Sequence, residues 1–65
     1  MLARVEKARA VAIATRFFGQ LNSDVFVKDV VLDNKVWIVT LSVGSDNKIQ
    51  QIKIDAHDGK ILGYE

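Results

Sequence analysis

The fold is decided by residues 48–65, KIQQIKIDAHDGKILGYE. Ile52 and Ile54 alternate with polar residues, which is typical of a strand that buries one face. Gly59 follows shortly and favours a tight turn, because glycine adopts positive φ at little steric cost. An apolar pattern then restarts in Lys60–Glu65 and indicates a second, shorter strand. This stretch therefore predicts a β-hairpin at the C-terminus.

The N-terminal part predicts a helix from about Ala3 to Gly19, because residues 7–17 contain neither glycine nor proline. One side of this helix is apolar, and its stripe comprises Ala3, Ala10, Ile13, Ala14, Phe17 and Leu21, with Val11 and Phe18 at one margin. We expect the stripe to pack on a sheet, with phenylalanine supplying most of the buried area.

The segment Val25–Leu32 is rich in β-branched residues and predicts the first strand. Lys28 and Asp29 fall on opposite faces of it, which indicates a bulge or an edge strand. The next three residues, Asp33–Lys35, predict a hairpin turn.

Val36–Val43 has the strongest strand pattern in the chain. Its predicted core face holds Trp37, Val39, Leu41 and Val43, and its other face holds Val36, Ile38, Thr40 and Ser42. With the hairpin 48–65, this gives one N-terminal helix packed on a four-stranded antiparallel meander sheet. The predicted fold class is α+β, with residues 1–65 forming a single small domain.

Length and composition restrict the function. A chain of 65 residues has room for one core, and its 49% hydrophobic and 26% charged residues are typical of a globular protein. It has no cysteine, and its net charge of +1 gives no general attraction to nucleic acid or anionic lipid. No apolar run is long enough to span a membrane. We expect a cytoplasmic location if the chain is complete, and the cell envelope or exterior if it is an excised domain.

The C-terminal hairpin resembles the PepSY type of domain, which occurs among peptidase propeptides and in cell-envelope proteins. The family signature is a strand, Asp-Ala, two variable residues, Gly, one variable residue and two aliphatics. Here it reads IKIDAHDGKIL over residues 52–62. The Trp37-x-Val39 strand and the alanine-rich helix are also similar to the family. Asp58 departs from the pattern, since the family often has threonine there, and an export signal is missing.

The resemblance implies one helix on an antiparallel sheet and a non-catalytic role in binding or restraining other proteins, peptidases in particular. It supplies no catalytic residue. The turn motif Asp55, Ala56 and Gly59 is interpreted as structural, with the Asp55 carboxylate accepting backbone N–H groups of the turn.

Chemistry-bearing side chains are few. Asp55, His57 and Asp58 have metal-ligand types, but no cysteine or second histidine is available to complete a transition-metal shell. No serine stands in a nucleophile-elbow pattern, and no glycine loop suits a phosphate. We therefore expect no enzyme activity, no metal and no cofactor.

Three binding hypotheses remain. The first is a protein-binding module that restrains a peptidase through a sheet edge or the uncovered sheet face; the candidate surface is Lys28, Asp29, Val36 and Ile38. The second is a homodimer formed through Val36 and Ile38. The third is nucleic-acid binding through Arg9 and Arg16, which is disfavoured because no exposed aromatic residues are interleaved with them.

Overall fold

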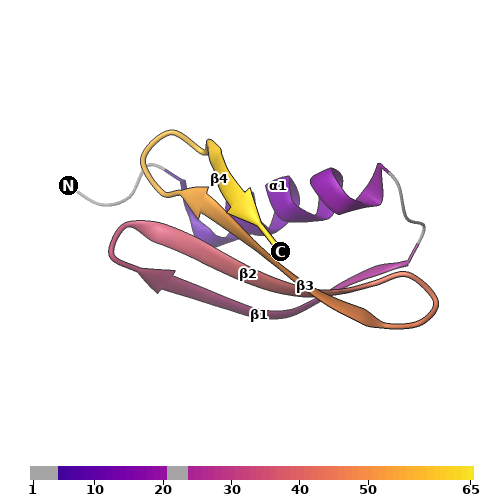
Figure 1. The fold of residues 1–65 in the computed structure, drawn as a ribbon. Helices are drawn as coiled ribbons and strands as arrows, with labels where there is room; N and C mark the ends of the chain where they lie inside the picture. Colours follow the sequence, from indigo (N-terminus) through magenta and orange to yellow (C-terminus); the bar gives the residue numbers. More distant parts are fainter. Residues whose placement is uncertain (1–4, 21–23) are drawn as a thin grey trace.

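The computed structural model describes residues 5–20 and 24–65 of the chain. Its elements are α1 (Lys7–Gly19), β1 (Val25–Asp33), β2 (Val36–Val43), β3 (Lys48–Asp55) and β4 (Ile61–Tyr64). The strands form one antiparallel sheet in the order β1-β2-β3-β4, and α1 lies against one face of it (Figure 1). The predicted α+β class, with one helix on a four-stranded meander, is confirmed.

The helix begins later than its composition predicts. It starts at Lys7, after Glu6, and not near Ala3, because Val5 is engaged with the sheet. The Val5 N–H donates to the carbonyl of Ala56 at 2.9 Å. Glu6, the N-cap, has an extended backbone with φ of −84° and ψ of 167°, so helical geometry begins only after it. The predicted stripe residues Ala3 and Leu21 lie outside the described residues.

The helix is also rotated relative to the predicted stripe. Ala10, Ala14 and Phe18 are its buried residues, spaced four apart along one line. Phe18, predicted at the margin, is only 7% exposed. Phe17 is partly buried beside it, with the two rings edge to face at 5.1 Å. Ala10 and Ala14 allow the helix to approach the sheet closely. Phe18 lies in line with these two alanines, so its side chain, and not that of Phe17, is in the core.

The sheet side of the core comes mainly from the two central strands. Its buried residues are Val39, Leu41, Val43, Ile52 and Ile54, and Ala56 is buried just after β3. Trp37 is partly buried against this cluster. The predicted core face of β2 is therefore correct, with the indole at its margin.

The sequence of β1 predicts a bulge or an edge position, and the structure has both. Val27 pairs with Leu41 and Asp29 pairs with Thr40, so Lys28 is the extra residue. An inserted residue shifts the alternation by one position. Val30 thereby pairs with Val39 on the core face. The β1–β2 turn is a two-residue loop in which Asn34 and Lys35 have φ of 50° and 64°.

Candidate functional site

The turn after β3 is closed by Asp55. Its Oδ1 atom accepts the N–H of His57 at 2.7 Å, and its carbonyl accepts the N–H of Gly59 at 2.9 Å. Gly59 has a φ of +80°, a backbone conformation that residues with a Cβ adopt only with strain. The side chain of Asp58 acts similarly, since its Oδ1 accepts the N–H of Lys60 at 2.8 Å. Both carboxylates thus bind backbone groups of the turn.

This turn connects three parts of the chain. The N–H of Ala56 donates to the Lys35 carbonyl at 3.0 Å, and the Ala56 carbonyl accepts from Val5. Gly59 lies against the helix: a Cβ there would be 3.4 Å from Ile13 Cδ1. The turn after β3 therefore contacts the β1–β2 turn, the residues before α1 and α1 itself. Among the described residues, no group of three His, Cys, Asp or Glu side chains is placed to hold a metal ion.

The sheet face opposite α1, here called the outer face, carries rows of side chains that cross the strands. One row joins Phe26, Ser42 and Ile49. Phe26 is 62% exposed and Ile49 is 56% exposed, whereas Ser42 between them is only 2% exposed. The Ser42 hydroxyl meets Asn47 Oδ1 at 3.2 Å. Apolar flanks therefore cover the serine and leave two large hydrophobic side chains in contact with solvent.

The candidate residues on β2 lie in the next rows of the outer face. Ile38 is half-buried between Val31 and Lys53, and Val36 is half-buried between Asp33 and Asp55. The central row is polar, with Gln51 donating to Thr40 at 3.3 Å. The rows of this face therefore combine apolar side chains with polar or charged ones.

Lys28 and Asp29 are both exposed on β1, the strand at one edge of the sheet. Lys28 is the bulged residue, and Asp29 stands on the outer face opposite Thr40. The structure does not bring these residues into one cluster with Val36, which pairs at the far end of β1 with Asp33.

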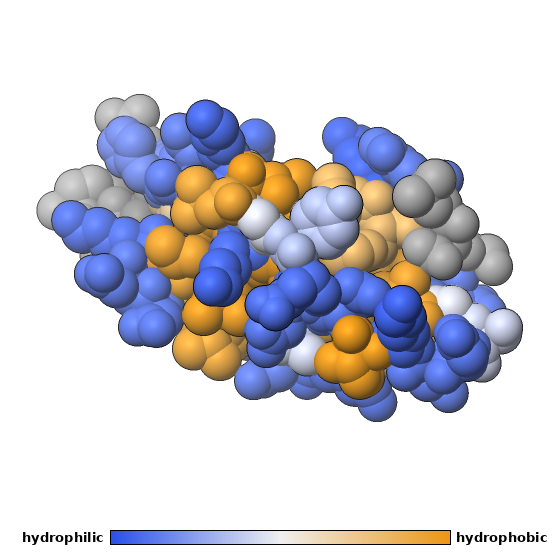
Figure 2. Space-filling model, viewed as in Figure 1, coloured by the Kyte–Doolittle hydropathy of each residue, from blue (hydrophilic) through white to orange (hydrophobic). Residues whose placement is uncertain are grey.

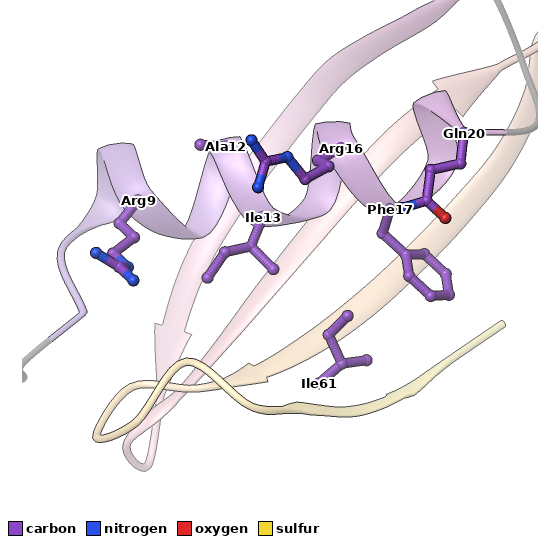
Figure 3. Close-up of a pocket in the computed structure, with 7 residues that line it drawn as sticks. All are labelled: Arg9, Ala12, Ile13, Arg16, Phe17, Gln20 and Ile61. Carbon is purple, nitrogen blue, oxygen red and sulfur yellow. The ribbon is translucent and has the colours of Figure 1, made fainter.

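A groove separates α1 from β4 at the other edge of the sheet. Its volume is about 590 Å³, and it is lined by Arg9, Ala12, Ile13, Arg16, Phe17, Gln20 and Ile61. Figure 3 shows Ile13 and Phe17 directed from α1 toward β4, with Ile61 directed back toward them. The Tyr64 ring contacts Phe17 at a centroid distance of 5.0 Å. On this side of the molecule, apolar side chains form a band bordered by hydrophilic ones (Figure 2).

Two features of these surfaces are absent from the sequence-based prediction. Phe26 has no special pattern in the sequence, and its outer-face position depends on the register of β1. The groove joins Phe17 to Ile61 across more than forty residues of chain. The groove could be predicted only if the direction of β4 after Gly59 were known. The glycine pattern predicts the turn but not that β4 runs beside α1.

α1 is the only helix in the described part of the chain, and it is too short to cross a bilayer.

Comparison with known families gives one clear result. Residues 4–65 match the model of the PepSY family, described as the peptidase propeptide and YPEB domain. The match covers almost the whole chain, so the protein belongs to the PepSY family. Comparisons with curated proteins and with solved structures give no significant match. The family resemblance seen in the hairpin 48–65 is thereby confirmed, and it places the chain among peptidase-associated modules.

Proposed function

We propose that this chain is a non-catalytic module that binds a protein partner, a peptidase in particular, and restrains its activity. The observation that carries the proposal is the PepSY match over residues 4–65, in a family described by its peptidase propeptides. A propeptide-like module acts by occupying or covering a peptidase, which requires a folded surface and no reaction chemistry of its own.

The outer face and the open sheet edges supply such a surface. Phe26 and Ile49 expose more than half of their area, and Ile38 adds a half-buried aliphatic side chain near the centre of this face. Exposed apolar residues bordered by charged ones are typical of protein-binding surfaces. Lys28 and Asp29 provide polar contacts beside the β1 edge. The partner surface in this proposal is therefore an extended strip, not a cluster: Lys28 lies at the β1 bulge, and Asp29, Ile38 and Val36 lie in successive rows of the outer face.

The test is a titration of purified peptidases from the source organism with the chain. Hydrolysis of a fluorogenic peptide is followed as the chain is added, and the chain is weighed by mass spectrometry afterwards. We expect at least one peptidase to be slowed in proportion to the added chain, with saturation at one chain per enzyme and the chain left intact. Unchanged rates across the panel, or slowing that merely tracks digestion of the chain, would exclude the proposal.

A second candidate function, self-association, has its own support. The exposed Phe26 and Ile49 lie on the same face as Val36 and Ile38, and a two-fold dimer buries the same patch on both subunits. Sedimentation equilibrium of the chain distinguishes the two. Dimerisation predicts a mass twice that of the 7.2 kDa chain, reverting to one chain in Ile38→Glu. A monomer at millimolar concentration would rule out this second function.

A further inference from the structure

We propose that the groove between α1 and β4 binds an extended, acidic segment of a protein partner. The segment adds as a strand beside β4 and inserts one apolar side chain between Ile13, Phe17 and Ile61. This inference rests on the proposed function, and it names the sheet edge and the chemistry of the partner.

The apolar part of the groove has the size and composition for one side chain. Ile13 and Phe17 from the helix and Ile61 from β4 converge on the same space, and all three are only partly buried (Figure 3). Ala12 keeps the wall low because its side chain is a single methyl group. A branched aliphatic side chain that enters this space would bury apolar area on both sides, which is favourable in water.

The charges of the groove select the partner. Arg9 and Arg16 are exposed, and they are the only charged residues among the described residues that line the groove. Neither arginine forms an ion pair with a carboxylate in residues 5–20 and 24–65. Complementary charges across an interface favour the correct partner and speed association. Two unpaired guanidinium groups beside an apolar floor therefore favour carboxylates in the bound segment.

The spacing of the arginines suggests a pattern. Seven residues of helix separate them by about 10 Å along the axis, at 1.5 Å per residue. An extended strand rises about 3.3 Å per residue, and alternate side chains share a face. Acidic residues four positions apart, with an apolar residue midway, therefore present all three side chains to the groove. The long arginine side chains accommodate the small difference in length.

The backbone of β4 is suited to receive a strand. β4 is the last strand of the sheet. The N–H and C=O of Glu65 both pair with Gln51, at 2.9 and 2.7 Å. Because successive residues of an antiparallel strand direct these groups to opposite sides, the peptide groups of Tyr64 face the open edge. An added strand finds a donor and an acceptor there, as in other cases of strand addition.

The experiment is a nuclear magnetic resonance titration of the ¹⁵N-labelled chain with a synthetic peptide. The peptide has seven residues, with glutamate second and sixth, leucine fourth and threonine elsewhere; a control peptide has lysine in place of both glutamates. We expect amide shifts confined to α1 and β4, and at least tenfold weaker binding of the lysine peptide. Equal binding of both peptides, no binding, or shifts on the outer face would overturn the inference.

Matched variants locate the site. Arg9→Glu with Arg16→Glu is expected to weaken binding about tenfold or more, whereas Lys35→Glu with Lys48→Glu makes the same change in net charge and should have less than a twofold effect. Ala12→Glu should weaken binding and Ala12→Lys should not. All five positions are exposed, so folding is expected to persist and is checked by circular dichroism. Equal losses in both double variants would mean a non-specific charge effect and would refute the site.

The second copy of the chain is the main competing occupant, because Asp29, Val31 and Asp33 of β1 repeat the acidic–apolar–acidic pattern. Self-assembly of the chain that disappears in the arginine double variant would assign the groove to a second copy and overturn the partner segment.

The peptidase titration separates the groove proposal from the proposed function. A peptidase slowed equally by the arginine double variant and by the original chain contradicts the groove alone. A panel in which no peptidase is slowed contradicts the proposed function, whatever the peptide does.

Discussion

The indole Nε1 of Trp37 donates a hydrogen bond to the carbonyl oxygen of Val5 at 2.7 Å. Val5 is 4% exposed and also donates its N–H to Ala56. Val5, two residues before the first residue of α1, is thus held by β2 on one side and by the turn after β3 on the other. This pair fixes the direction in which α1 enters its position on the sheet.

Trp37→Phe should therefore lower the free energy of unfolding by more than the loss of buried apolar area alone would. The Val5 carbonyl keeps its burial and loses its donor, and an unsatisfied buried acceptor costs about 1 to 3 kcal/mol. Urea unfolding followed by circular dichroism measures the change. A midpoint equal to that of the original chain would show that the hydrogen bond contributes nothing.

Gly59→Ala should destabilise the turn by about 1 to 2 kcal/mol, because an added Cβ is strained at a φ of +80°. The new methyl group also approaches Ile13 and Val5, at 3.4 and 3.5 Å. Gly63→Ala is the matched control, since nothing lies within 4 Å of a Cβ there. Thermal unfolding of both variants should separate them, and equal melting temperatures would contradict this role of Gly59.

Asp55→Ala should lower the free energy of unfolding by about 1 kcal/mol, because the N–H of His57 loses its acceptor. Asp55→Asn retains a side-chain oxygen at the same place and should restore most of the loss. The two variants are compared by urea unfolding. If asparagine were no better than alanine, the hydrogen bond would not be the reason for the aspartate.

Phe18→Ala should cost about 3 to 5 kcal/mol, as expected for a large buried side chain. Phe17→Ala should cost about 1 to 2 kcal/mol, because Phe17 is only partly buried beside the groove. A domain of this size has a total stability of about 3 to 10 kcal/mol, so the first variant is expected to be partly unfolded. The opposite order of the two losses would contradict the helix orientation described above.

The sequence predicts most of the sheet because its strands follow a period of two. In Val36–Val43 this period assigns Val39, Leu41 and Val43 to the core without knowledge of any partner strand. The β1 bulge is also foreseen, from the change of pattern at Lys28, although its effect on Phe26 depends on the pairing register.

The helix is harder to orient from the sequence. Alanine and phenylalanine occupy more than one side of it, and the choice between Phe17 and Phe18 depends on which line of small residues meets the sheet. The position of the helix start depends on two distant residues, since the N–H of Val5 donates to Ala56 and its carbonyl accepts from Trp37. The groove likewise depends on β4 lying beside α1, and no local pattern encodes that tertiary arrangement.

Hydrogen–deuterium exchange on the chain, alone and bound to a peptidase that it slows, tests the central claim that a folded module restrains its partner through surface contacts. Complex formation should slow amide exchange along the open edges in β1 and β4, while β2 and β3 remain as protected as before. Faster exchange in β2 and β3, or an unchanged pattern throughout residues 5–20 and 24–65 while the peptidase is slowed, would contradict the account.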